Sequence, residues 1–245
     1  MSESRDWRKV RAEVKDFVEN EVYPAESILN ERSEESNQKL KELMGKAKEK
    51  NLWALGHPED IGGQGMPFME YVYVNEVVGR SSPAMVALGT HSLQDSIMLR
   101  EFASDRWREA YLGPLVAGEI FPSFGMTEPD TASSDPTQLQ TAAVLEDGEW
   151  VINGRKWFTS GAARAAYTTV MVRTEPDTSG HGAFSMIIVP TDNPGYKIVR
   201  ETPVLGINGG HYEVEYDNVR VPEENLLGPR GHGFIIAQRL SLIHI

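Results

Sequence analysis

Residues 124–135 read Phe-Gly-Met-Thr-Glu-Pro-Asp-Thr-Ala-Ser-Ser-Asp, and this stretch is the most informative one for the fold. Pro129 and the Asp and Ser residues around it exclude a regular helix or strand across the whole stretch. Small hydroxyl side chains and free backbone N–H groups can form a polar cradle for an anion or a ring carbonyl. The stretch therefore predicts a ligand-binding loop. A polar turn that leaves a strand is the simpler interpretation of so short a motif taken alone.

A second motif follows at residues 153–161, which read Asn-Gly-Arg-Lys-Trp-Phe-Thr-Ser-Gly. It places an aromatic side chain, Trp157, two positions before a hydroxyl, Thr159. A single Trp more often fills a protein core than a binding site. The presence of both motifs in one chain, in this order, favours the binding interpretation for each of them.

The chain around the motifs changes character near residue 120. Before it, apolar residues recur at helical spacing, as at Trp7, Val10 and Val14. Helical segments are expected around residues 7–18, 40–47, 68–79, 84–88, 95–102 and 106–117. After it, strand patterns are expected at residues 139–145, 150–152, 167–172, 184–189, 196–199 and 212–216. A helical half followed by a strand-rich half predicts an α+β fold with two packed units.

Composition excludes several classes of function. The net charge of −12 argues against nucleic acid and against an anionic membrane surface as partners. The chain has no cysteine, which excludes disulfides, thiolate metal sites and cysteine nucleophiles. The six histidines show no metal-ligand spacing, so no metal is expected and solvated or loop roles are predicted for them. Neither a signal region nor a bilayer-spanning apolar run is visible. We therefore expect a cytoplasmic protein, or a mitochondrial or peroxisomal one if the source is eukaryotic.

Both motifs resemble the flavin-binding middle domain of the acyl-CoA dehydrogenase family. That family reads roughly Tyr/Phe-x-x-Thr-Glu-Pro, small residues and Ser-Asp, and then Asn-Gly-x-Lys-x-Trp-x-Thr/Ser. Three flanking segments are also similar to the family, at residues 55–65, 111–119 and 219–228. The resemblance extends from about residue 7 to residue 240. The segment 130–135 is one residue longer than the commonest family version and is similar to the branch of the human family members ten and eleven.

The resemblance implies FAD as the cofactor and a particular domain order. Residues 1–120 would form the all-helical N-terminal domain, and residues 121–228 a β-rich, barrel-like or sandwich-like, flavin-binding middle domain. Residues 229–245 would begin a C-terminal four-helix domain that is otherwise absent, and the tail 241–245 does not continue the family pattern. The family's catalytic base lies in that last domain. No catalytic residue is therefore expected within this chain, which by itself should be nearly inactive.

The resemblance also assigns roles to individual residues. Thr127 and the backbone of Phe124, Gly125 and Met126 would bond the pyrimidine part of the flavin ring. Ser133 would face the FAD pyrophosphate, and Ser134 would face the pantetheine arm of the substrate. The alignment with the family can shift by one position here, so Ser134 is also a candidate for the cofactor contact. The cofactor contacts of the second motif would be Trp157, Phe158 and Thr159, with Thr159 near the flavin N5. Glu128 would fix the turn before Pro129 rather than act as a general base.

By resemblance, the parent protein would oxidise a fatty acyl-CoA to the trans-2-enoyl-CoA. Its electrons would pass to an electron-transfer flavoprotein, and it would be a homo-oligomer, either a tetramer or a dimer. Acyl-CoA oxidases and flavin monooxygenases of the same fold remain an alternative. The other alternative is a non-catalytic fragment that binds FAD or acyl-CoA.

Overall fold

The structure is a computed structural model, which describes residues 6–31, 33–205 and 209–239. His244 and the rest of the tail 241–245 lie outside the described residues. The chain divides into two compact units, each described here by itself. The helical unit comprises Met1–Ile97 with Val116–Gly118, and the sheet unit comprises Met98–Leu115 with Glu119–Ile245. The domain boundaries expected at residues 120 and 228 stay predictions.

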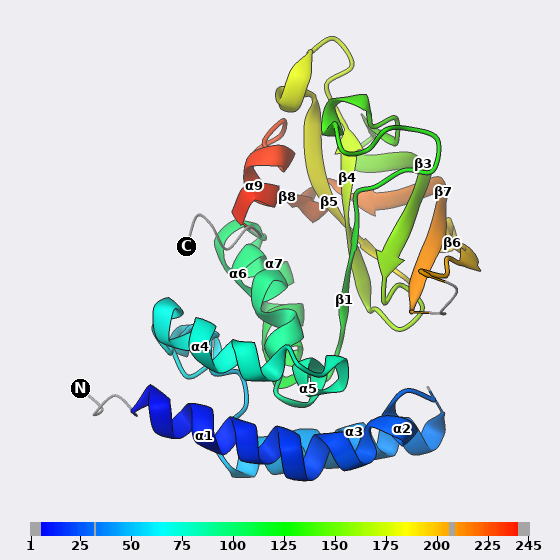
Figure 1. Cartoon of the computed structure of the whole chain (residues 1–245). Coiled ribbons are helices and arrows are strands. Elements are labelled where there is room, and N and C mark those ends of the chain that lie inside the picture. Colours follow the sequence, from blue (N-terminus) through cyan, green and yellow to red (C-terminus); the bar gives the residue numbers. More distant parts are fainter. Residues whose placement is uncertain (1–5, 32, 206–208, 240–245) are drawn as a thin grey trace. The chain divides into compact units, whose positions relative to one another are not determined.

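The helical unit confirms the helical pattern predicted for the N-terminal part of the chain (Figure 1). Its α-helices are α1 (Trp7–Phe17), α2 (Glu26–Leu29), α3 (Glu34–Glu49), α4 (Phe68–Val78), α5 (Ser82–Ala87) and the start of α6 (Leu93–Phe102). Val10, Val14 and Phe17 of α1 are buried, as their helical spacing predicts. After α1 the chain continues through a π-helical turn and then a 3-10 turn that contains Pro24, whose ring cannot continue an α-helix.

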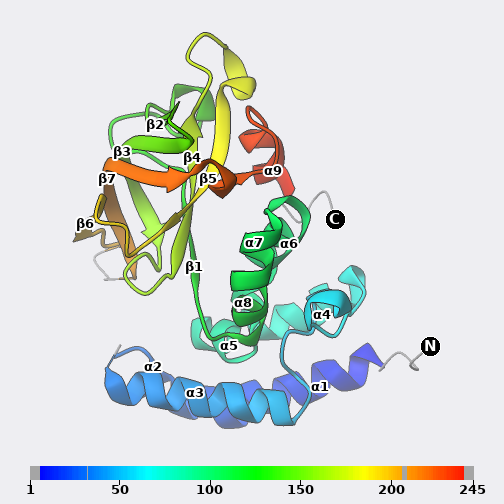
Figure 2. The ribbon, with the colours of Figure 1, turned by 180° about the vertical axis from the view of Figure 1, so that it is seen from behind.

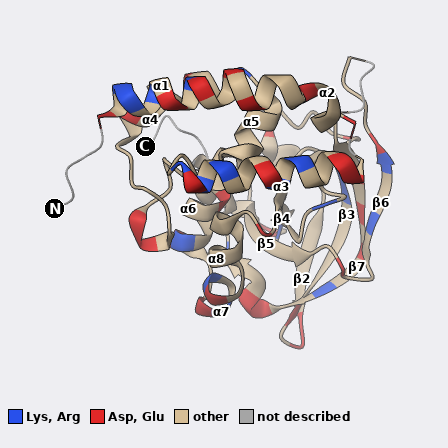
Figure 3. Ribbon diagram, turned by 90° about the horizontal axis from the view of Figure 1, so that it is seen from below, with Lys and Arg blue, Asp and Glu red and all other residues tan. Residues whose placement is uncertain are grey.

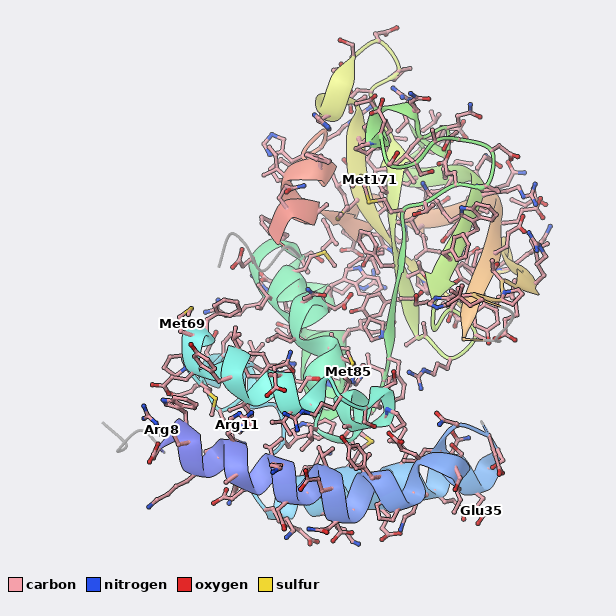
Figure 4. The ribbon with its side chains drawn as sticks, in the orientation of Figure 1. Arg8, Arg11, Glu35, Met69, Met85 and Met171 are labelled. Carbon is pink, nitrogen blue, oxygen red and sulfur yellow. The ribbon has the colours of Figure 1, made fainter. Side chains whose placement is uncertain are left out.

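The charges of α1 and α3 lie along exposed helix surfaces (Figure 3). Ser33 caps α3 by accepting a hydrogen bond from the Ser36 N–H, and Lys46 and Lys48 occupy the last turn. Cations there are favoured by the negative end of the helix dipole. Some apolar side chains of the unit are also exposed, among them Met69 of α4 and Met85 of α5, both labelled in Figure 4.

The glycines of the loop 55–65 are required by close backbone approaches. Gly62 and Gly65 have φ angles of 95° and 61°, in the left-handed region that favours glycine. A side chain at Gly63 would place its Cβ atom 2.1 Å from the His57 carbonyl oxygen. His57 lies in this loop, as expected, but it is not solvated. Its ring is buried, and its Nε2 atom lies 3.1 Å from the Ser92 hydroxyl.

The sheet unit is built on one mixed sheet of eight strands (Figure 2). The strands are β1 (Pro122–Gly125), β2 (Ala142–Glu146), β3 (Glu149–Ser160), β4 (Tyr167–Arg173), β5 (Phe184–Pro190), β6 (Tyr196–Glu201), β7 (His211–Pro222) and β8 (Leu226–Leu227). Seven of them follow the order β6-β7-β3-β2-β4-β5-β8, and β1 pairs with β4 in parallel. The unit also contains α7 (Asp105–Trp107), α9 (Gly233–Arg239), the rest of α6 from Met98, and the part of α8 (Gly113–Ala117) up to Leu115.

Several strand boundaries differ from the sequence prediction, and β7 continues to Pro222, whereas the prediction ended at residue 216. The segment expected to be a strand at 139–145 becomes β2 only from Ala142, because a 3-10 turn occupies Pro136–Gln138. The strand expected at 150–152 is instead β3, which continues through the whole second motif. The strands β1 and β8 were not predicted at all. Strands β2 and β3 are joined by a hairpin turn, with Asp147 and Gly148 both at positive φ.

Strands β4 and β5 contribute most of their residues to the core of the sheet unit. Six of the seven residues of β4 are buried, and so are six of the seven residues of β5. Burial of nearly every residue is typical of strands covered on both faces. Met171 of β4 is almost fully buried and is labelled in Figure 4. These buried strands form a firm support for β1, which pairs with β4 and leads into the first motif.

Candidate functional site

The first motif begins on a strand and continues as a loop. Phe124 and Gly125 form the end of β1, where they pair in parallel register with Thr169 and Val170 of β4. Met126 and Thr127 begin the loop. A Cβ atom at Gly125 would lie 3.2 Å from the Tyr216 hydroxyl oxygen. This close approach favours glycine at the point where the loop leaves the sheet.

The two motifs lie against each other. The Trp157 N–H of β3 donates a hydrogen bond of 2.9 Å to the Thr127 carbonyl oxygen. The residue before it, Lys156, donates from its Nζ atom to the Met126 carbonyl oxygen at 2.9 Å. Residues thirty positions apart in the sequence are therefore joined directly at the centre of the candidate site.

A buried ion pair lies beneath this junction. The Lys156 Nζ atom is 2.8 Å from a carboxylate oxygen of Glu128, and the two side chains are 0% and 5% exposed. The same carboxylate accepts hydrogen bonds from the backbone N–H groups of Gln140 at 2.7 Å and Thr141 at 2.9 Å. The Glu128 carboxylate is buried and accepts hydrogen bonds from all three of these donors. It therefore fixes the loop and is not available as a general base.

Burial and pairing oppose each other in this ion pair. Burial raises the pKa of Glu128, but the Lys156 ammonium and the hydrogen bonds outweigh it and hold the pKa below its ordinary value. Burial lowers the pKa of Lys156 to about 8, against the raising effect of Glu128. The pair is therefore charged at neutral pH. Backbone groups form further hydrogen bonds with each of its two side chains.

The loop that carries the two serines folds on itself. The Ser133 hydroxyl accepts a hydrogen bond of 2.8 Å from the Glu128 N–H and lies 2.9 Å from the Thr131 hydroxyl. Ser134 is exposed. Of the two serines, Ser133 thus organises the loop, and Ser134 presents its side chain to solvent. Their predicted contacts with cofactor and substrate stay predictions.

A β-bulge shapes the second motif. The pairing register of β3 with β7 shifts between Lys156 and Thr159, which places one extra residue in β3. Phe158 occupies the bulge with a φ of 51°, an uncommon value for a residue with a bulky side chain. Its ring is 38% exposed and lies beside Trp157, with ring centroids 4.7 Å apart. Unusual backbone of this kind is concentrated at functional sites.

Two buried polar atoms of the second motif have no partner among the residues that the structure describes. They are the Thr159 hydroxyl oxygen and the Trp157 indole nitrogen. Thr159 is 0% exposed. Buried polar atoms are rarely left without hydrogen bonds in native proteins. These residues therefore fit a site that is completed by a polar, planar ligand, and they include two of the contacts predicted from the sequence.

Two neighbours of the motifs were not identified from the sequence. Lys156 lies inside the second motif, but lysine is almost never fully buried unless it is paired, so composition alone suggests an exposed position. No signal in the sequence indicated its burial, because its partner Glu128 lies 28 residues away. The second neighbour is His211, whose Nδ1 atom lies 2.8 Å from the Ser160 hydroxyl.

The described part of the chain contains neither a candidate metal site nor a candidate membrane-spanning helix. Residues 6–31, 33–205 and 209–239 contain no group of three or more His, Asp or Glu side chains that could hold a metal ion. Within the same residues, every helix is too short or too polar to cross a bilayer.

Two family models match the chain. The acyl-CoA dehydrogenase N-terminal domain matches residues 4–119, and the acyl-CoA dehydrogenase middle domain matches residues 123–219. The Mycobacterium tuberculosis protein called "Probable acyl-CoA dehydrogenase FadE2" is 38% identical over 93% of this chain. Mouse acyl-CoA dehydrogenase family member 10 is 36% identical over 94% of it. The branch resemblance inferred from the sequence is thereby confirmed.

Solved structures agree with these matches. A Mycobacterium abscessus protein assigned to the acyl-CoA dehydrogenases is 32% identical, covers 98% of this chain and has a TM-score of 0.87. An acyl-CoA dehydrogenase from Bacillus anthracis, solved in complex with FAD, is 27% identical, covers 98% of this chain and has a TM-score of 0.79. This chain spans 59% of the length of FadE2, 23% of mouse family member 10, 64% of the M. abscessus chain and 41% of the B. anthracis chain.

Proposed function

Because the chain belongs to the acyl-CoA dehydrogenase family, we propose that its parent protein is an FAD-dependent acyl-CoA dehydrogenase. In this proposal it desaturates the α,β bond of a fatty acyl-CoA to give the trans-2-enoyl-CoA. One observation carries the proposal: the Trp157 N–H is bonded to the Thr127 carbonyl at 2.9 Å, which joins the two motifs into one site. The FAD complex of the Bacillus anthracis relative supports the choice of cofactor.

The proposed cofactor contacts are those that the family resemblance assigns to the motif residues. We assign the hydroxyl of Thr127 and the backbone of Phe124–Met126 to the pyrimidine edge of the flavin. Trp157 and Phe158 cover the ring and exclude water, and the unpartnered Thr159 hydroxyl bonds near N5. Ser133 is assigned to the pyrophosphate. Preorganised donors of this kind favour the build-up of negative charge on a ring that accepts electrons.

When bound, FAD supplies the acceptor for the hydride that leaves the β-carbon of the thioester. Ser134, which is exposed, is assigned to the pantetheine arm of the acyl-CoA. We do not assign Glu128 as the catalytic base, because its carboxylate is occupied by Lys156 and by two backbone N–H groups. The family resemblance assigns the base to the C-terminal domain of the parent protein. The proposed electron acceptor of the parent protein is an electron-transfer flavoprotein, and the proposed assembly is a homo-oligomer.

The test is an assay with FAD, an acyl-CoA and an artificial electron acceptor on the full parent protein. Dye reduction that depends on the acyl-CoA, and that falls sharply in a Trp157→Ala variant, is the expected result. A protein that retains a yellow cofactor without turnover would favour the binding-only alternative. Dye-independent consumption of oxygen with production of peroxide would favour an acyl-CoA oxidase.

A further inference from the structure

Lys156 and Glu128 carry charges into the interior of the sheet unit, and the proposed function gives neither residue a task. Their side chains are 0% and 5% exposed. Replacing a buried ion pair with apolar residues of similar volume is often neutral or stabilising, so stability alone explains such a pair poorly. Buried polar pairs are better explained where they select one arrangement among several. The question is therefore which arrangement this pair selects.

The contacts of the Lys156 ammonium answer this question. Its Nζ atom donates to the Met126 carbonyl at 2.9 Å and to the Glu128 carboxylate at 2.8 Å. Met126 and Glu128 are the residues directly before and after Thr127. The next residue of β3, Trp157, holds the Thr127 carbonyl itself. Two consecutive residues of β3 thus hold three consecutive residues of the first motif.

Glu128 extends this connection to a third segment. Its carboxylate accepts hydrogen bonds from the Gln140 and Thr141 N–H groups, just before β2. The Thr141 hydroxyl in turn donates to the Arg155 carbonyl at 3.3 Å, which returns to β3 next to Lys156. A Cβ atom at Gly154 would lie 2.5 Å from that Thr141 hydroxyl, so β3 and Thr141 are in close contact. The ion pair therefore connects three segments that also contact one another: the first motif, the residues just before β2, and β3.

We propose that Lys156 and Glu128 form a positioning clamp, which sets Thr127 against Trp157 so that the Thr127 hydroxyl and the Trp157 ring meet the same flavin. The inference rests on the proposed FAD site. Neither residue touches the cofactor in this account. The clamp acts on the backbone of residues 126–128, and its two opposite charges allow one register of the loop against β3.

The test must separate positioning from simple stability. Lys156→Met alone leaves a buried carboxylate without its cation, and this variant may fail to fold for that reason alone. The informative protein is the double variant Lys156→Met/Glu128→Gln, which removes both charges together. The matched control is Lys197→Met/Asp217→Asn, which removes an exposed pair at 2.6 Å between β6 and β7.

Two measurements are made on the 245-residue chain. Hydrogen exchange reports the protection of the Trp157 N–H, which needs no ligand, with the amides of β5 as an internal reference. Equilibrium titration reports the dissociation constant for FAD, at a temperature well below the unfolding midpoint of each variant. Protection that is lost only at Trp157 and its neighbours cannot come from a general loss of stability.

In the double variant we expect about tenfold less protection at the Trp157 N–H and about tenfold weaker FAD binding, with β5 unchanged. The control variant should match the wild type in both measurements. Unchanged protection at Trp157 in a folded double variant would overturn the clamp. A wild-type chain that binds no FAD would count against the proposed function, whereas the exchange measurement would still decide whether the clamp exists.

Discussion

A lysine ion pair of the helical unit and a lysine ion pair of the sheet unit differ in how far they are exposed to water. In the helical unit Lys46 contacts Glu42 and Glu21 at 3.0 Å and 2.8 Å, and the three side chains are 33–47% exposed. In the sheet unit Lys156 and Glu128 form a pair of similar length, 2.8 Å, that is almost completely buried. The N–O distances of the two pairs are similar, but only the Lys156–Glu128 pair is shielded from water. The difference indicates that charge is buried where the chain needs a defined loop.

The largest expected effect separates these two pairs directly. Lys156→Met should lower the free energy of unfolding by about 3–5 kcal/mol, because it leaves the buried Glu128 carboxylate without its partner. The measurement is urea unfolding at neutral pH. The double variant with Glu128→Gln should recover most of that loss. A single variant as stable as the wild type would show that the carboxylate is hydrated or protonated, and the contrast between the units would disappear.

The second effect concerns pH and lies in the helical unit. Burial lowers the pKa of His57 to about 4 from the ordinary 6.5. Between these values the unfolded chain binds the proton and the folded chain does not, so stability is complete above pH 6.5 and falls as the pH decreases toward 4. At about 1.4 kcal/mol for each pH unit, the loss is about 3 kcal/mol.

His57→Asn should remove this slope between pH 6.5 and pH 4. The comparison of variant with wild type is needed because burial also raises the pKa of Asp95 to about 7, which has the opposite effect on stability. The measurement is urea unfolding at a series of pH values. Parallel slopes in the two proteins would mean that the His57 ring is accessible to protons in the folded state.

A smaller pH effect is expected in the sheet unit. Burial and the attraction of Lys156 oppose each other at Glu128, with a net lowering of its pKa from 4.5. A depressed carboxyl pKa stabilises the fold above the unfolded value, and this stability is lost as the pH falls below about 4.5 and through the folded pKa. In Glu128→Gln the unfolding midpoint should depend less on pH in this range. An unchanged pH profile would contradict the charge pairing.

The smallest effect is expected for the exposed ion pairs of Lys46 in the helical unit. Lys46→Ala should leave the unfolding free energy unchanged within experimental error, because exposed ion pairs are screened and contribute little. Salt should likewise leave the wild type and the variant equally stable. A clear destabilisation by Lys46→Ala would show that the surface pairs matter as much as the buried one.

The sequence predicted most of the scaffold, for reasons visible in particular elements. Val10, Val14 and Phe17 repeat at helical spacing and are all buried. The apolar runs that became β4 and β5 are long enough to predict central strands. In contrast β1 has four residues, begins with Pro122 and merges into the loop, and β8 has only two. Such short strands are determined by their partners in the sheet and not by their own sequences.

The sequence named candidate residues for the site but not the contacts between them. Family resemblance pointed to Thr127 and Trp157, and the structure joins them by a backbone hydrogen bond. The bulge at Phe158 could not be predicted, because it arises from a register shift against β7. The burial of Lys156 could not be predicted either. A lysine in a strand is expected to be exposed unless its partner is known, and Glu128 is 28 residues away in the sequence.

The central claim is that the unpartnered Thr159 hydroxyl belongs to a flavin site, and one measurement tests it most directly. It is the thermal unfolding midpoint of Thr159→Val and of the wild type, each with and without FAD. Without FAD the variant should be equal to the wild type or more stable by about 1 kcal/mol, since it removes a buried hydroxyl that has no partner. The increase in midpoint that FAD causes should be smaller in the variant.

Ser104→Ala is the control, because the Ser104 hydroxyl also has no partner among the described residues and lies outside both motifs. It should leave the effect of FAD unchanged. The account predicts a Thr159→Val protein that is no less stable alone and gains less from FAD. A Thr159→Val protein that is destabilised alone and gains as much from FAD as the wild type would contradict it.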